Sequence, residues 1–497
     1  MDILNTQLIA QFIPALPEAI LFLMILVIMV VDLYLSDAQR HITYALSMGA
    51  LMVVAVLSFY ALKSGQTEYI FNGMFVLDPL ACLLKLCSAL ALMMTLLLSR
   101  QYIAERDLFK GEFYILSLFA MLGQMVMISA NNFLTVYLGL ELMSLSFYAL
   151  VALRRDSAVA TEAAMKYFIL GALASGFMLY GFSMIYGAVG GLLNFPEMAY
   201  LLNRQPANDI LLILGLVFVV AGLAFKLGAV PFHMWVPDVY QGAPTAVTLL
   251  LGAAPKLAAF AIVFRMLIEG MIYMSPAWQD MLMVMAVLSL VVGNLVAIAQ
   301  KNLKRMLAYS TIAHMGFVLL GFTSGVVNGN LISSSAAYSA ALFYVIIYVL
   351  TTLGTFGMIL LLARNGFEAE ELSDLKGLHQ RSPWYALMML ILMFSLAGVP
   401  PTAGFYAKLV LLQSVVNAGH LGLAVIAVLT SLVGAFYYLR VVKLMYFDEP
   451  TDTQALAPRR GLHFALSVSG ILALLLGIFP GGLLTLCLQV IDVTLHS

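Results

Sequence analysis

The sequence is poor in charged residues and in cysteine. Only 10% of its 497 residues are charged and 63% are hydrophobic, whereas an ordinary soluble chain carries roughly a quarter charged residues. The three cysteines, Cys82, Cys87 and Cys487, form no CxxC pair, which argues against a haem, iron–sulfur or zinc site. Glycine-rich phosphate loops are missing too. We therefore expect neither a metal nor a nucleotide cofactor in this chain.

The sequence contains many long apolar runs, and these runs have the length of bilayer-spanning helices. The first run lacks a basic start and a small-residue cleavage site and contains Glu18 and Asp32, so it is interpreted as a retained helix and not a signal peptide. The pattern predicts an all-α polytopic membrane protein of about 14 transmembrane helices. The predicted spans are 13–35, 42–62, 78–99, 112–129, 132–152, 160–189, 209–236, 245–268, 277–299, 303–323, 334–363, 383–416, 420–446 and 462–490.

Basic residues in the predicted connections are distributed unevenly. If the N-terminus lies outside, nearly all loop lysines and arginines fall on the cytoplasmic side, and the outer connections hold only Lys63, Arg204 and Arg265. This is the positive-inside bias of membrane proteins. It predicts that both termini lie on the outer, periplasmic side.

The basic residues left inside the predicted spans are all lysines. They are Lys85, Lys166, Lys226, Lys256 and Lys408. Lysine can release its proton when buried, whereas arginine cannot. Lys226, Lys256 and Lys408 are the deepest, and we expect them to titrate during transport, with a static ion pair as the alternative, because an intramembrane charge costs about 2.5–3.5 kcal/mol. Lys166 also suits an intrahelical ion pair with Glu162, and Lys85 could snorkel to the outer interface.

Glu141 is the only carboxylate near the centre of a predicted span. A nearby carboxylate favours the charged form of a lysine, and desolvation disfavours it. Opening or closing a Glu141–lysine contact would therefore change the affinity of the lysine for a proton. His233 and His314 also lie within predicted helices and could relay protons near neutral pH, although a lone buried histidine more often serves only as a hydrogen-bonding residue.

Two predicted spans carry prolines that would interrupt the helix. Pro231 lies in the seventh span, close to Lys226, and Pro400 and Pro401 lie in the twelfth, close to Lys408. Paired interrupted helices are typical of transport sites, although a simple kink is the alternative.

The number of spans suggests an internal repeat. Helices four to eight and nine to thirteen form two sets of five, and an odd-numbered repeat must be inverted relative to its copy. Helix seven then matches helix twelve, which pairs Lys226 with Lys408, and the Glu141 helix matches the His314 helix. The predicted division is residues 1–111 for helices one to three, 112–268 and 277–446 for the two repeats, and 447–497 for helix fourteen.

Several stretches resemble one known family. They are Leu16–Glu18, Tyr167–Gly176, Lys226–Thr245, Asn302–Gly316 and Ser395–Phe405. They closely resemble the antiporter-like membrane subunits of bacterial NADH–quinone oxidoreductase (respiratory complex I), and their combination resembles its subunit N family. The resemblance implies the inverted repeats and broken helices described above. It also implies an essential glutamate matching Glu141 and functional lysines matching Lys226, Lys256, Lys408 and Lys166.

The same resemblance implies how work is divided within a larger translocase. NADH, FMN, iron–sulfur clusters and quinone would be bound by other subunits, and this chain would carry proton transport without a cofactor of its own. Its expected partners are the antiporter-like subunit M and the small membrane subunits J and K, in the bacterial inner membrane. The alternatives are a subunit of a multi-subunit Na⁺/H⁺ antiporter and a passive membrane scaffold. Sodium coordination would favour a cluster of buried oxygens, and the single deep acid favours protons.

Overall fold

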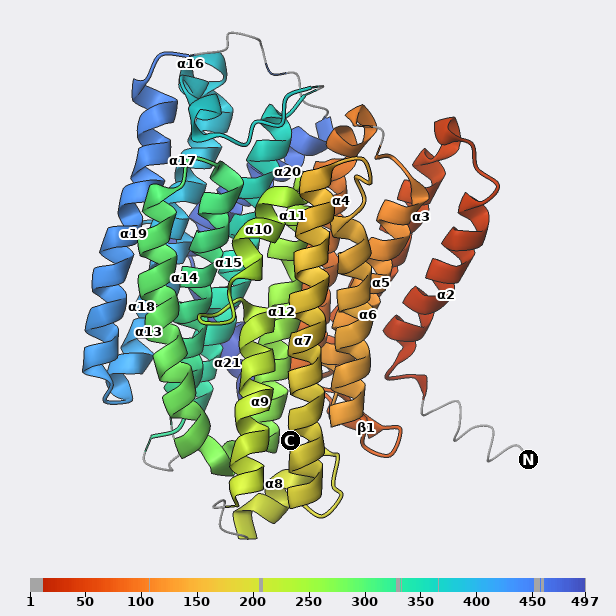
Figure 1. Cartoon of the computed structure of the whole chain (residues 1–497), viewed down its shortest axis with the longest axis vertical. Helices are drawn as coiled ribbons and strands as arrows, with labels where there is room; N and C mark the ends of the chain where they lie inside the picture. The colour runs from red at the N-terminus through yellow and green to blue at the C-terminus, as the bar shows by residue number, and fades with distance from the viewer. Residues whose placement is uncertain are drawn as a thin grey trace.

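The computed structural model describes residues 12–106, 108–204, 209–327, 331, 333–364, 366–450, 456 and 460–496. In this part of the chain, helices run side by side in one bundle, with a short β-hairpin at one end (Figure 1). The first helices are α2 (Leu16–Asp32), η1 (Asp37–Gln39), α3 (His41–Ser64), α4 (Pro79–Glu105), α5 (Gly111–Ile128), α6 (Phe133–Val151), α7 (Ala158–Ala188), α8 (Phe195–Arg204), α9 (Ile210–Leu227) and α10 (Trp235–Gly242). The hairpin pairs β1 (Glu68–Ile70) with β2 (Phe75–Leu77) in antiparallel register.

The second half of the chain continues the bundle. Its helices are α11 (Thr245–Gly252), α12 (Ala254–Val263), η2 (Phe264–Gly270), η3 (Ile272–Met274), α13 (Ser275–Ala299), α14 (Leu303–Thr323), α15 (Ser334–Leu362), η4 (Leu372–Leu375), α16 (Leu378–Arg381), α17 (Pro383–Ala397), α18 (Ala403–Asn417), α19 (Leu421–Phe447), α20 (Arg460–Ile478) and α21 (Gly481–His496). Thirteen helical stretches of the described residues are long and apolar enough to cross a membrane. The predicted all-α polytopic fold is confirmed.

The core of the bundle lies around three of these stretches. In the most apolar 18-residue segment of Thr245–Gly270, every residue is buried. In the corresponding segments of α14 and α15, 94% and 89% of the residues are buried. By contrast, only 28% of the residues in the most apolar segments of α2 and α19 are buried. These two helices present apolar side chains outwards, as lipid-facing helices do. The residues that the sequence singles out by polarity lie mostly on or against the buried stretches.

Two helices are broken where the sequence predicts interruption. Helix α9 ends before Gly228, at φ +79°, and α17 ends before Gly398, at φ +85°. Glycine adopts this left-handed conformation without steric cost, so both breaks begin with a standard helix C-cap. Each break frees carbonyl groups that the helix would otherwise satisfy.

Two further divisions were not predicted. The predicted span 245–268 separates at Ala253 into α11 and α12, and it continues into the π-helix η2. The predicted span 462–490 separates into α20 and α21, with Pro480 in the connection. Both regions are continuously apolar, so hydropathy alone cannot divide them. Pro255 and Pro480 are compatible with a new helix start, because proline lacks the N–H that an interior helical position needs.

Both ends of the described chain lie at the end of the bundle that carries the hairpin, below in Figure 1. Ala15, just before α2, packs against Ile70 and Phe75 of the hairpin. Near the other terminus, His496 lines one cavity together with Tyr69 of β1. We call this the hairpin end; the opposite end is the loop end. Termini at the same end require an even number of crossings, which agrees with the predicted topology.

Candidate functional site

Lys256 closes the first helix break. Its amine donates hydrogen bonds to the carbonyl oxygens of Leu227, at 2.9 Å, and Lys226, at 3.5 Å. These carbonyls lie at the end of α9, where the break removes their helical partners. The Lys256 residue is 1% exposed, so it is buried inside the bundle. The amine therefore satisfies backbone groups that would otherwise be unpaired at membrane depth.

Lys408 makes the same kind of contact at the second break. Its amine donates to the carbonyl oxygens of Leu396 and Ala397, both at 3.0 Å, and to Ser431 Oγ at 2.8 Å. The predicted pairing of helix seven with helix twelve agrees with these two breaks. The predicted equivalence of Lys226 and Lys408 does not, because Lys226 precedes its break and Lys408 follows its own. Lys408 has the contacts of Lys256.

Lys226 lies between α9 and α6. Its amine donates a 2.8 Å hydrogen bond to Ser144 Oγ. Glu141, one turn before Ser144 on the same helix, has one buried carboxylate oxygen without a hydrogen-bond partner among the described residues. Within the same residues the structure records no ion pair between Glu141 and Lys226. The predicted contact between Glu141 and a lysine is therefore not formed with Lys226 in this structure, and the serine hydroxyl accepts from the amine instead.

His314 is buried in a network of hydroxyl groups. Its Nδ1 lies 2.7 Å from Tyr344 Oη, and its Nε2 lies 3.1 Å from Tyr438 Oη. His314 and Lys408 line one cavity of about 10 Å³, which is the room of about one water molecule. The structure thus places this predicted relay residue beside Lys408. His233 differs: it lies in the connection between α9 and α10, half-buried, and its Nδ1 has no partner among the described residues.

Lys166 is the most exposed of the predicted site lysines, with 43% of its side chain accessible. It pairs with Glu162 at 2.8 Å, as its spacing on the helix predicts, and also with Asp238 of α10 at 2.8 Å. Asp238 in turn pairs with Arg305 of α14 at 2.7 Å. This chain of charges lines a cavity of about 160 Å³, and it joins three helices toward the loop end. Sequence spacing gave the first pair only, because the other two are contacts between helices.

Two buried ion pairs correct the sequence analysis. Lys85 does not snorkel: it is 1% exposed and pairs with Glu18 of α2 at 2.5 Å. Arg265 does not lie in an outer connection: it is 1% exposed in η2 and pairs with Asp78 at 2.6 Å. The buried basic residues are thus not all lysines. The position of Arg265 within the apolar run 245–268 was the available signal.

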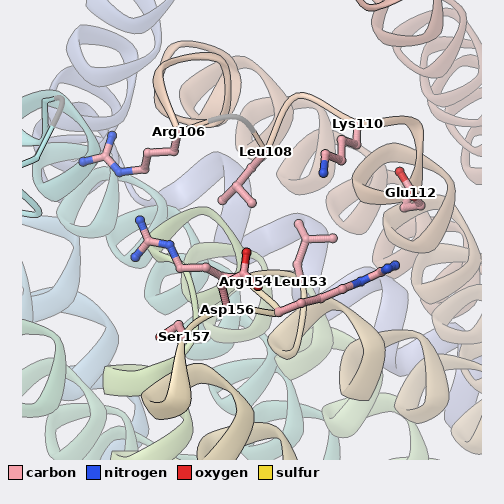
Figure 2. Close-up of a pocket in the computed structure, with 9 residues that line it drawn as sticks. Arg106, Leu108, Lys110, Glu112, Leu153, Arg154, Asp156 and Ser157 are labelled. Carbon is pink, nitrogen blue, oxygen red and sulfur yellow. The ribbon is translucent and has the colours of Figure 1, made fainter.

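A larger polar cavity, of about 560 Å³, lies at the loop end between the ends of α4 and α6 (Figure 2). Arg106 and Arg154 line it, and both bind Glu368, each at 3.0 Å. Burial alone would raise the pKa of Glu368, but the hydrogen bond and charge of Arg106, with further contributions from Tyr102 and Arg154, lower that pKa below its ordinary value. None of the predicted site residues lines this cavity. Its arginines connect α4 and α6 to the chain after α15.

Comparison with known proteins agrees with this geometry. The family described as NADH:quinone oxidoreductase/Mrp antiporter, TM, matches residues 130–434. The NADH-quinone oxidoreductase subunit N of Herminiimonas arsenicoxydans is 60% identical over 491 residues, which are 98% of this chain and 99% of that protein. A chain of respiratory complex I from Thermus thermophilus is 32% identical, has a TM-score of 0.79, and is matched over 94% of this chain and 98% of its own length.

A chain of the Mrp complex from a Dietzia species shares the fold, with a TM-score of 0.82, 20% identity, and coverage of 96% of this chain and 97% of that one. The bundle, its broken helices and its buried charges define an antiporter-like, proton-translocating membrane subunit. Within that class, the chain belongs to the subunit N family of NADH-quinone oxidoreductase, as a multi-pass component of a bacterial respiratory complex. The resemblance drawn from the sequence motifs is confirmed.

Proposed function

We propose that protons cross this chain along the residues Glu141, Lys226, Lys256, His314 and Lys408. The observation that carries the proposal is the set of partners of the three deep lysines. Their amines donate to backbone carbonyls and serine hydroxyls, and in the described residues none of the three forms an ion pair. A permanently charged amine at membrane depth would need a counter-charge. Neutral acceptors hold both the charged and the neutral amine, which suits a group that gains and loses a proton.

Movement at Glu141 would set the charge on Lys226. In this structure the Lys226 amine binds Ser144, one turn away from Glu141 on the same helix face. A shift of α6 against α9 would bring the carboxylate to the amine and favour the charged form. Release of that contact would pass the proton to Lys256 and, through the hydroxyl network around His314, to Lys408. Moving one charge against 100 mV costs about 2.3 kcal/mol. The change in the proton affinity of Lys226 must therefore be of this size in free energy.

Membership of the family supports a proposal for the partner subunits of this chain and for the location of the cofactors. We infer that NADH oxidation, FMN, the iron–sulfur clusters and quinone reduction belong to other subunits, and that this chain has no cofactor of its own. Subunit M and the small subunits J and K are the proposed neighbours. The distribution of basic residues favours the hairpin end, with both termini, on the periplasmic side of the inner membrane. His233, in the α9–α10 connection, and Lys166, at the loop end, are proposed as secondary members of the route.

The first test is NADH-driven proton pumping in membrane vesicles with Lys226→Ala, normalised to assembled complex. We expect pumping to fall by about a hundredfold or more, with slower quinone reduction, because a positioned proton carrier contributes about 10²–10⁴-fold. Lys63→Ala is the matched control, since Lys63 is an exposed lysine in the last turn of α3. Wild-type pumping by an assembled Lys226→Ala complex would contradict the proposed route.

A further inference from the structure

A second charged cluster lies near the hairpin end, away from the deep lysines. Arg265 donates to both carboxylate oxygens of Asp78, at 2.6 and 2.8 Å, and to Glu269 at 2.5 Å. Its Nε also faces the carbonyl oxygen of Ile128 at 3.4 Å. The side chains of Arg265 and Asp78 are each 1% exposed, and that of Glu269 is 19% exposed. Arg265 therefore forms a buried bidentate ion pair with Asp78. Glu269 forms a second ion pair with the same guanidinium group.

The backbone at this cluster is unusual. Residues Phe264–Gly270 form a π-helix that continues α12. Single π-helical turns are rare and occur frequently at functional sites. Asp78 comes from a separate element, as the N-cap of α4, where its side chain also accepts from Ala81 N. Thus two helix ends, and not one local sequence motif, bring the three charged side chains together.

The charges in this region do not balance. A second ion pair, Lys85–Glu18, lies close by, because Lys85 is on α4, seven residues after the N-cap Asp78. Together the described groups comprise two cations and three carboxylates. Asp78 forms a bidentate ion pair with Arg265, and Glu18 forms an ion pair with Lys85. Glu269 shares an arginine that Asp78 already neutralises, so its negative charge is not compensated. A buried uncompensated charge is costly, and a proton on Glu269 would remove it.

Glu269 lines a cavity, and 19% of its side chain is accessible. A cavity of about 520 Å³ at the hairpin end is lined by Glu269, Asp78 and Tyr338. The Tyr338 hydroxyl is buried and has no hydrogen-bond partner among the described residues. The rim carries Asp492 and His496, which lie 3.7 Å apart. With Tyr69 and Tyr338, these are the titratable groups of the described chain that share the cavity with the cluster.

Glu269 also lies in line with the deep route. Lys256 precedes Arg265 by nine residues on the same helical stretch, or about 14 Å at 1.5 Å per residue. Apolar rings fill the interval: Phe260 stacks near Phe264, with centroids 6.4 Å apart, and lies 5.0 Å from Phe322. An apolar layer thus lies between the cluster and Lys256, and the cluster lines the cavity.

We propose that Glu269, positioned by the Asp78–Arg265 pair, is the site at which this subunit exchanges protons with the water at the hairpin end. In the release step, the O–H bond of the Glu269 carboxyl breaks, cavity water takes the proton as hydronium, and the carboxylate stays hydrogen-bonded to Arg265. In the next cycle the carboxylate regains a proton that the buried route of the proposed function delivers. This inference rests on the proposed function, in which the chain conducts protons, and it adds the group that faces the aqueous phase.

The test uses the complete complex in vesicles with Glu269→Gln, which keeps the shape and an acceptor for Arg265 but cannot release a proton. We expect NADH-driven pumping per assembled complex to fall by about tenfold or more, and a pH-dependent carboxyl C=O infrared band to disappear. Glu197→Gln is the matched control, because Glu197 is an exposed carboxylate of α8 at the same end. The control should keep both pumping and the band.

Glu269→Asp is the second variant, since it keeps a titratable group. It should retain most of the pumping and shift the pH dependence of the infrared band. The proposal is overturned if Glu269→Gln pumps like the wild type, or if it loses pumping while the band remains. If Glu269→Gln does not assemble, Glu269→Asp decides: an unchanged band overturns the proposal. Wild-type pumping in Glu269→Gln with lost pumping in Lys226→Ala rejects only the exchange site, whereas wild-type pumping in Lys226→Ala rejects the route itself.

Discussion

Replacing Lys408 separates the two roles that its contacts suggest. The amine closes the break after α17 by donating to two backbone carbonyls, and it is also a proposed proton carrier. Lys408→Met keeps the length of the side chain but has no donor. Lys408→Arg keeps donors but cannot release a proton in a protein. If both roles exist, the methionine variant loses stability and pumping, whereas the arginine variant loses mainly pumping.

The magnitude follows from the groups left unpaired. Lys408→Met leaves the carbonyls of Leu396 and Ala397 without their donor at membrane depth. An unsatisfied buried polar group costs about 1–3 kcal/mol, so the two together predict a loss of about 2–6 kcal/mol in free energy of unfolding. Ser431→Ala is the matched control. It removes one hydroxyl from the same amine but leaves both carbonyl contacts, and it should cost about 0.5–1.5 kcal/mol.

The assay combines heat stability of the purified complex with proton pumping normalised to assembled complex. Lys408→Arg should stay closer to wild-type stability than Lys408→Met, and its pumping should fall by about a hundredfold or more. Wild-type pumping by the arginine variant would refute the idea that Lys408 must release its proton. Unchanged stability of the methionine variant would refute the reasoning about the freed carbonyls.

Two smaller predictions concern Ser144 and Glu368. Ser144→Ala removes the hydroxyl that holds the Lys226 amine, a hydrogen bond worth about 0.5–1.5 kcal/mol, so pumping per assembled complex should change by about two- to tenfold; an unchanged rate would mean that this contact is incidental. Glu368→Gln should cost about 1.5–3 kcal/mol near neutral pH, because Arg106 is buried against the charged carboxylate. The lowered pKa of Glu368 means that this stabilisation is complete above its ordinary value of 4.5 and is lost as pH falls through the lowered pKa. Heat stability of the variant should therefore approach that of the wild type in acid, and a constant difference at every pH, or an equal loss in the exposed control Glu112→Gln, would contradict this origin.

The interruption of α9 and α17 shows what local chemistry can predict. Proline and glycine act through their own backbone, so Pro231 and Pro400 identify a break without knowledge of neighbouring helices. Pro255 is a local signal compatible with the division at Ala253, but the π-helix after α12 has no comparable sequence signal. Helix α12 packs against α4 and α5, and a hydropathy pattern contains no information about such packing.

The buried charged residues also show that sequence patterns do not predict contacts between distant elements. Depth along an apolar run correctly predicted that Lys226 and Lys256 are buried, and Lys408 is partly buried. Their partners were not predictable, because each amine binds a group at least eleven residues away in the sequence. A contact between Glu141 and a lysine was inferred from the rarity of buried acids, but Lys226 donates to Ser144 here and, in the described part of the chain, forms no ion pair with Glu141.

The sequence by itself determined the helical membrane fold, the family, the two expected breaks and the residues whose burial in lipid would be costly. These follow from composition, period and the intrinsic chemistry of lysine, glutamate, proline and glycine, which do not depend on partners. Only the tertiary structure decided that Lys256 and Lys408 close the breaks, that Lys85 pairs with Glu18, and that Arg265 joins Asp78 and Glu269 beside a cavity. Those contacts join elements distant in sequence, and the energy of a buried charge depends on the groups that the fold places around it.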